Sequence, residues 1–77
     1  MVEGVIAYDL DLHQFEMISL PERKKRFLEV GDTVEVLIDN VWTIVHLESG
    51  GYLGRYFILP DGQFIRPALC MKVRFNL

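Results

Sequence analysis

The sequence contains a single cysteine, Cys70, so the chain cannot form an internal disulfide. Its histidines, His13 and His46, show no spacing with this cysteine that is typical of a zinc site. We therefore expect no metal and no other cofactor. A lone thiol is typical of a reducing compartment, and we expect a cytoplasmic protein.

Long apolar runs are also missing. No stretch approaches the roughly 20 apolar residues that a membrane span needs. The N-terminal stretch MVEGVIAYDLD combines acidic residues with only a brief apolar run, unlike a secretory signal peptide. We expect no membrane partner.

Basic residues are scarce. Eight Lys and Arg side chains stand against eleven Asp and Glu, which gives a net charge of −3. Four of the eight lie together at positions 23–26, so the rest of the chain has eleven acids against four bases, a balance of −7. Proteins that grip a phosphate backbone usually distribute their bases across one face. The overall balance argues against nucleic acid as the main partner.

Apolar residues are abundant, at 51% of the chain, with 12% aromatic. These side chains must fill a core or leave an apolar patch for a partner, and they exclude disorder. The length of 77 residues allows one domain. We divide it into an N-terminal hairpin (4–18), a basic connector (19–29) and a barrel core (30–77).

The stretch Val30–Leu59 contains three runs of β-branched and aromatic residues, separated by Gly-Asp, Asp-Asn and Ser-Gly-Gly. This pattern predicts consecutive antiparallel strands joined by tight turns. A two-residue turn at positions 39–40 places Ile38 opposite Val41. One face, the predicted core, then carries Val34, Val36, Ile38, Val41, Thr43, Val45 and Leu47. The other face carries Leu37, Trp42 and Ile44 together with Glu35, His46 and Glu48.

The turn at positions 50–51 leaves two alternatives open. A two-residue turn places Gly54, Tyr56 and Ile58 on the core face, and Leu53, Arg55 and Phe57 beside Trp42. A three-residue loop exchanges these two sets, because a slip of one residue turns every side chain to the opposite face.

The flanking segments predict further strands. Residues 4–18 read as a hairpin with a loop at 9–12. Ser19–Glu22 has the form of a capping box, so residues 19–27 form either a short helical turn or an irregular loop.

Beyond Val30–Leu59, whose consecutive antiparallel strands we call the meander, Pro60-Asp61-Gly62 predicts a tight turn. Residues 63–65 predict a short strand. Residues 66–69 read as a 3₁₀ turn. A last strand follows, with Met71, Val73 and Phe75 inward and Lys72 and Arg74 outward. The prediction is an all-β fold: a small SH3-like barrel with a five-strand meander-type core, an added N-terminal β-hairpin and one optional helical turn.

The sequence resembles a family of small uncharacterised bacterial proteins with an SH3-like barrel, often encoded on mobile elements. The residues that carry the resemblance are Gly4, Val5, Ile6, Tyr8, Phe15, Gly31, Asp32, Val34, Glu35, Val36, Asp39, Trp42, Glu48, Val73 and Arg74. The sequence departs from that pattern at Asn40, where Gly is more usual, and by the insert at positions 23–26. The resemblance implies the fold and carries over no catalytic residue.

Trp42 is the only tryptophan and has two interpretations. It is either a half-buried packing residue beneath the N-terminal hairpin, or an aromatic anchor for a partner. Because both faces of the meander are apolar in so short a chain, we expect a non-enzymatic module that binds another protein or a second copy of itself. The candidate partner-binding residues are Leu37, Trp42, Ile44, Tyr52 and Phe57.

The run of four basic residues at positions 23–26 is the most distinctive polar feature of the sequence, and it too has several interpretations. It is a solvated loop, a group that pairs with acids on a second copy, or a site for nucleic-acid phosphates. The candidate nucleic-acid-binding residues of this alternative are Arg23, Lys24, Lys25, Arg26, Lys72 and Arg74. No pair of nucleophile and base emerges from the sequence, so we expect no enzymatic activity.

Overall fold

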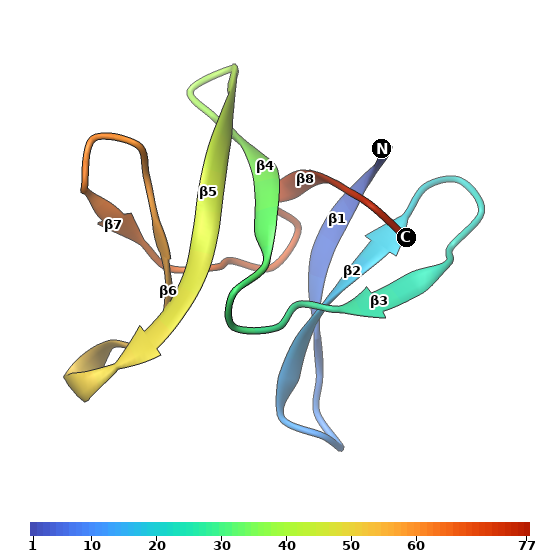
Figure 1. The fold of residues 1–77 in the computed structure, drawn as a ribbon. Coiled ribbons are helices and arrows are strands. Elements are labelled where there is room, and N and C mark those ends of the chain that lie inside the picture. Colours follow the sequence, from blue (N-terminus) through green and yellow to red (C-terminus); the bar gives the residue numbers. More distant parts are fainter.

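The computed structural model describes all 77 residues and is all-β (Figure 1). Its strands are β1 (Val2–Asp9), β2 (Gln14–Ser19), β3 (Lys25–Phe27), β4 (Thr33–Ile38), β5 (Val41–Gly50), β6 (Gly54–Ile58), β7 (Phe64–Ile65) and β8 (Lys72–Phe75). The only helical element is the 3₁₀ turn η1 (Gly51–Leu53). The chain thus has no helix of the length and apolarity that crossing a membrane requires.

The eight strands form one antiparallel sheet in the order β3-β2-β1-β8-β4-β5-β6-β7. The last strand, β8, lies between β1 and β4 and so joins the N-terminal strands to the meander β4–β7. Strands β3 and β7 are the two edges and do not pair with each other, so the sheet is not closed. Figure 1 shows β1–β3 on one side of β4 and β8, and β5–β7 on the other.

The β4–β5 hairpin has the predicted register. Ile38 pairs with Val41 across a two-residue turn, and the pairing continues down both strands. Asp39 and Asn40 have φ angles of 50° and 62°. Positive φ at both central residues is what a type I′ turn requires, and Asn and Asp tolerate this conformation better than other side chains do.

The β5–β6 hairpin adopts the three-residue alternative. Gly50 pairs with Gly54 around the 3₁₀ turn, and Leu47 pairs with Phe57. Phe57 is therefore on the core face, where it is fully buried. Tyr56 and Ile58 take its place on the face of Trp42, because side chains alternate along a strand.

The N-terminal hairpin closes one residue later than predicted, with Asp9 paired to Gln14. Asp9 Oδ1 accepts hydrogen bonds from the backbone N–H groups of Asp11 (2.9 Å) and Leu12 (3.1 Å), which tightens the loop. The Tyr8 and Phe15 rings pack edge to face with centroids 5.0 Å apart.

The connector 19–29 forms no helical turn, so that expectation was wrong, and within 19–27 the alternative of an irregular loop holds only for residues 20–24. Its middle part is β3, which pairs with β2. Ser19 does not cap a helix: its Oγ accepts a hydrogen bond from Lys24 N–H (3.1 Å), and its N–H donates to Lys24 O (2.8 Å). Residues 25–27 form a strand because a strand can pair with the free edge of β2, whereas so short a helix has little stability of its own.

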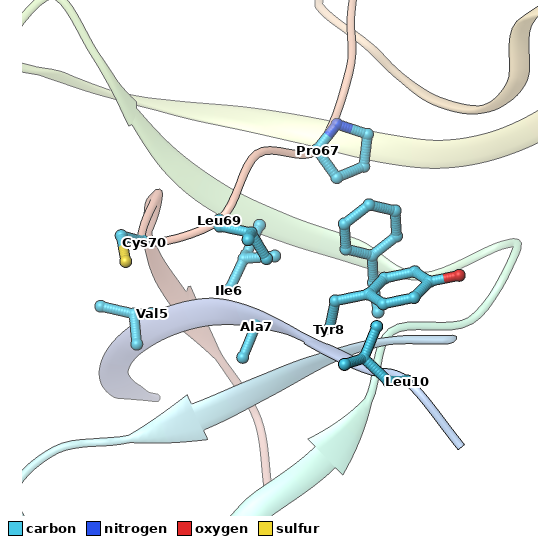
Figure 2. Close-up of a pocket in the computed structure, with 9 residues that line it drawn as sticks. Val5, Ile6, Ala7, Tyr8, Leu10, Pro67, Leu69 and Cys70 are labelled. Carbon is cyan, nitrogen blue, oxygen red and sulfur yellow. The ribbon is translucent and has the colours of Figure 1, made fainter. Parts of the chain in front are cut away.

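The segment before β8 is not the predicted 3₁₀ turn; residues 66–68 are irregular and a turn follows at 69–70. It runs beside the end of β1, where Cys70 N–H donates to Ile6 O (2.8 Å) and Ile6 N–H to Met71 O (2.9 Å). An apolar groove lies between this segment and β1 (Figure 2). Strand β8 then presents its side chains as predicted, with Val73 and Phe75 fully buried.

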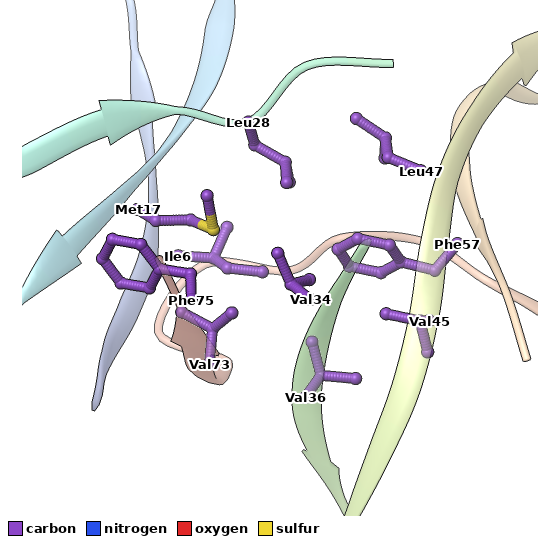
Figure 3. Close-up of a cluster of buried hydrophobic side chains, with 10 residues drawn as sticks. All are labelled: Ile6, Met17, Leu28, Val34, Val36, Val45, Leu47, Phe57, Val73 and Phe75. Atoms are coloured by element: carbon purple, nitrogen blue, oxygen red, sulfur yellow. The ribbon is translucent and has the colours of Figure 1, made fainter. Parts of the chain in front are cut away.

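The core lies on the inner face of the sheet, which curls so that its two halves face each other (Figure 3). Its buried side chains are Ile6, Met17, Leu28, Val34, Val36, Val45, Leu47, Phe57, Val73 and Phe75. The predicted core residues of the meander are thus buried in the centre of the strands. Val41, at the hairpin tip, is 61% exposed instead.

Candidate protein-binding surface

The outer face of the meander, opposite the core, carries a second set of apolar side chains. Leu37 pairs with Trp42 across β4 and β5, and Ile58 pairs with Phe64 across β6 and β7. Side chains of directly paired residues lie on the same face of a sheet. We call this set the outer apolar face; it comprises Leu37, Trp42, Ile44, Tyr56, Ile58 and Phe64.

The outer apolar face is open to solvent. Ile44 is 53% exposed and Phe64 is 58% exposed, while the other four members are half-buried. Tyr56 and Phe64 pack edge to face with ring centroids 5.2 Å apart. Large apolar side chains gathered on an uncovered sheet face are typical of an interaction surface.

Side chains of β8 and β1 fix the position of Trp42. The guanidinium carbon of Arg74 lies 4.0 Å from the centroid of the indole ring. Arg74 Nη2 is 3.0 Å from Glu3 Oε1, and its Nε donates to the same oxygen at 3.1 Å. The N-terminal hairpin thus continues the sheet beside Trp42, contributing Glu3, and does not lie over the outer apolar face.

Polar side chains lie between and around the apolar ones. Glu35 pairs with Ile44, and Glu48 pairs with Tyr56. His46 lies on the same face of β5, with its Nδ1 2.7 Å from Thr33 Oγ1. An apolar centre with a polar rim is the usual anatomy of a protein–protein interface.

The structure brings three of the five predicted partner-binding residues together: Leu37, Trp42 and Ile44. Tyr52 lies in the 3₁₀ turn at the hairpin tip, fully exposed and away from the strand faces. Phe57 belongs to the core, because the three-residue loop turns it inward.

Tyr56, Ile58 and Phe64 were not among the predicted residues. The three-residue alternative for the loop between β5 and β6 already places Tyr56 and Ile58 beside Trp42. Phe64 can be assigned to this face only once the pairing between β6 and β7 is known.

The basic residues do not form one patch. Lys25 Nζ lies 4.0 Å from the buried carboxylate of Glu16, and Arg26 Nη2 lies 2.9 Å from Asp32 Oδ2. Arg74 is held by Trp42 and Glu3, as described above. The candidates without an ion pair are Arg23, Lys24 and Lys72. In the sheet order, strands β2 and β1 separate β3 from β8, so the basic residues of positions 23–26 and those of β8 belong to different parts of the sheet.

The two histidines and the cysteine lie on three different elements. His13 is in the β1–β2 loop with a φ of 53°, His46 is on β5, and Cys70 is in the turn before β8 with a φ of 67°. Cys70 is exposed.

The outer apolar face offers dispersion contacts, an indole fixed by a guanidinium, and nearby carboxylates. This is the chemistry of reversible binding, in which a few aromatic anchors contribute most of the affinity. Comparison of the chain with known protein families, curated proteins and solved structures found no match.

Proposed function

We propose that this protein is a non-enzymatic interaction module that binds another protein, or a second copy of itself, through the outer apolar face centred on Trp42. One observation carries the proposal: six apolar side chains share an uncovered sheet face, although the opposite face already holds a complete core. Apolar residues on an outer face add nothing to that core. A partner that covers them removes their apolar surface from water, which favours association.

The size of the molecule suits this role. A standard interface buries about 800 Å² on each partner. The two longest extents of the chain are 34 Å and 31 Å, so one broad face has room for such an interface. Exposed Ile44 and Phe64 supply apolar contact, while half-buried Trp42 supplies a fixed aromatic anchor.

The two outermost strands, β3 and β7, offer little opportunity for strand addition. The edge strands are short, with three residues in β3 and two in β7. Short edges offer few unpaired backbone groups to another strand. We therefore place the partner on the outer apolar face and not along β3 or β7.

We also propose that the meander and β8 form an SH3-like barrel that is open between β7 and β8. The order of β4–β7, with β8 returning to pair with β4, supports this assignment. Strands β1–β3 are then an N-terminal extension that continues the sheet from β8.

Nucleic-acid binding is the alternative proposal, and it rests on exposed Arg23, Lys24 and Lys72, which have no carboxylate partner. Three of the six candidate bases are engaged by Glu16, Asp32 and Glu3. This leaves the alternative with less support than the outer apolar face.

Sedimentation and affinity capture of Ile44→Glu test the proposal. The matched control is Leu12→Glu, because Leu12 is similarly exposed, at 58%, but lies in the β1–β2 loop. We expect the wild-type protein and Leu12→Glu to self-associate or to bind the same partner, and Ile44→Glu to lose that association. Equal association of the wild type and Ile44→Glu would overturn the proposal.

A further inference from the structure

The groove beside β1 lies apart from the outer apolar face. Its walls come from β1 and β2 on one side and from residues 67–70 on the other (Figure 2). Its volume is about 560 Å³, and eight of its nine lining residues are hydrophobic. Tyr8 and Phe15 are its largest side chains, and Leu69 is 64% exposed.

A second hollow of about 350 Å³ adjoins the apolar groove. Tyr8, Phe15 and Pro67 line both, so they form the wall that the two hollows share. The second hollow is polar, because Arg55, Arg66 and His13 line it together with Leu53. We call the two adjoining hollows the cleft; it has an apolar end and a basic end.

The two arginines of the basic end have no carboxylate partner. The ion pairs of the chain use Lys25, Arg26 and Arg74, and neither Arg55 nor Arg66 takes part in one. Two unpaired guanidinium groups at one end of an apolar cleft complement a carboxylate, which they can bind with charge-assisted hydrogen bonds.

The main chain of Tyr8 is also unpaired at this cleft. The N–H and C=O of Ile6 both point away from β2, to Met71 and Cys70. In an antiparallel strand these directions repeat every second residue, so the N–H and C=O of Tyr8 point to the same side. The pairing of β1 with β8 covers only residues 2–5, and Tyr8 has no backbone partner there. The cleft thus offers one free donor and one free acceptor of a strand edge.

We propose that this cleft binds an extended peptide segment of a partner protein, with an apolar side chain in the groove and an Asp or Glu side chain at Arg55 and Arg66. The apolar walls fit the first group, and the unpaired arginines fit the second. The free N–H and C=O of Tyr8 pair with the peptide backbone, as in strand addition.

A peptide fits these features better than a fatty acid does. An alkyl chain cannot pair with the N–H and C=O of Tyr8, whereas a peptide backbone satisfies both. Both hollows are also open to solvent, so a peptide chain can extend beyond them. A peptide segment that carries both an apolar and an acidic side chain is therefore the occupant that uses every feature of the cleft.

A peptide array tests the proposal. Its acetylated and amidated seven-residue peptides carry Val, Leu, Ile, Met or Phe at a central position, followed one or two residues later by Asp or Glu. Matched peptides carry Asn or Gln instead. We expect the best acidic peptides to bind at least about tenfold more tightly than their amide counterparts, because a hydrogen bond to a charged group is stronger than a neutral one.

Three variants separate this site from the outer apolar face. Arg55→Gln and Arg66→Gln should each abolish the preference for acidic peptides, and Leu69→Ser should weaken binding of all of them. Ile44→Glu should leave peptide binding unchanged, so failure here and failure of the proposed function are distinguishable. Binding should also shift the Tyr8 amide resonance and protect it from hydrogen exchange.

Three results would overturn the proposal: no peptide binding at millimolar concentration, equal binding of acidic and amide peptides, or unchanged binding by Arg55→Gln and Arg66→Gln. Decanoate is a further probe. If decanoate binds the cleft and no peptide does, the site takes small carboxylates and not a protein segment.

Discussion

Arg74 lies over Trp42, with its guanidinium carbon 4.0 Å from the centroid of the indole ring. The same guanidinium group is held by Glu3 on the neighbouring strand β1, at 3.0 Å and 3.1 Å. This arrangement fixes the indole before any partner arrives. A preorganised anchor loses less conformational entropy on binding, which supports our assignment of Trp42 as the aromatic anchor of the outer apolar face.

We predict that Arg74→Ala loosens Trp42. The cation–π contact contributes about 0.5–1 kcal/mol at a partly exposed site. The free energy of unfolding should fall by about that amount, and the Trp42 fluorescence should shift to longer wavelength as the ring becomes more hydrated. Because Trp42 is the only tryptophan, its emission reports this site alone. Lys24→Ala is the control, since Lys24 is an exposed base that makes no ion pair and lies in the loop before β3, away from Trp42. Unchanged emission in Arg74→Ala would contradict the contact.

Because the loop between β5 and β6 has three residues, we predict different losses of stability for substitutions at two aromatic residues. Phe57→Ala should lower the free energy of unfolding by about 3–5 kcal/mol, because it leaves a cavity in the core. Tyr52→Ala should change it by less than about 0.5 kcal/mol, since Tyr52 is fully exposed. Denaturant unfolding measures both values. A small effect of Phe57→Ala would instead indicate that Phe57 lies on the outer face.

Gly4 lies where β1 approaches β2 too closely for a side chain. A Cβ atom at Gly4 would clash with the backbone oxygen of Ile18. We expect Gly4→Ala to destabilise the fold by about 1–3 kcal/mol, as other overpacked sites do. Gly50→Ala is the matched control, because nothing lies within 4 Å of its Cβ position and its φ of 162° suits any residue. Thermal unfolding should separate the two variants; equal melting temperatures would contradict the close approach.

The type I′ turn predicts the effect of changes at Asn40. Asn40→Ala should destabilise the protein by about 1 kcal/mol, because its φ of 62° is costly for most side chains. Asn40→Gly should cause no loss, since Gly adopts this conformation freely. Chemical denaturation of the two variants gives the comparison. Greater stability of Asn40→Ala than of Asn40→Gly would exclude this turn.

The parts of the fold that were predictable depend on local pattern. Alternation of apolar and polar residues predicted β4, β5 and β8, and the Asp39-Asn40 turn fixed the β4–β5 register. The β5–β6 loop stayed open because either loop length satisfies the local sequence, and only the burial of Phe57 decides between them.

Other parts depend on residues far apart in the sequence. Ser19–Glu22 fits a helix cap as well as a hairpin turn, and the free edge of β2 decides in favour of β3. Phe64 joins the outer apolar face only through its pairing with Ile58. The cleft beside β1 needs Tyr8, Arg55 and Pro67 to come together in space, which no local pattern indicates.

The most direct test of the central claim is a ¹H–¹⁵N NMR spectrum of the labelled protein, recorded dilute and then in its associated state with a partner or at high concentration. We predict that the single Trp42 indole resonance shifts, together with the amides of Ile44, Ile58 and Phe64. The amides of residues 23–26 should not move. Shifts confined to residues 23–26, with the indole resonance unchanged, would contradict binding through the outer apolar face and favour the nucleic-acid alternative.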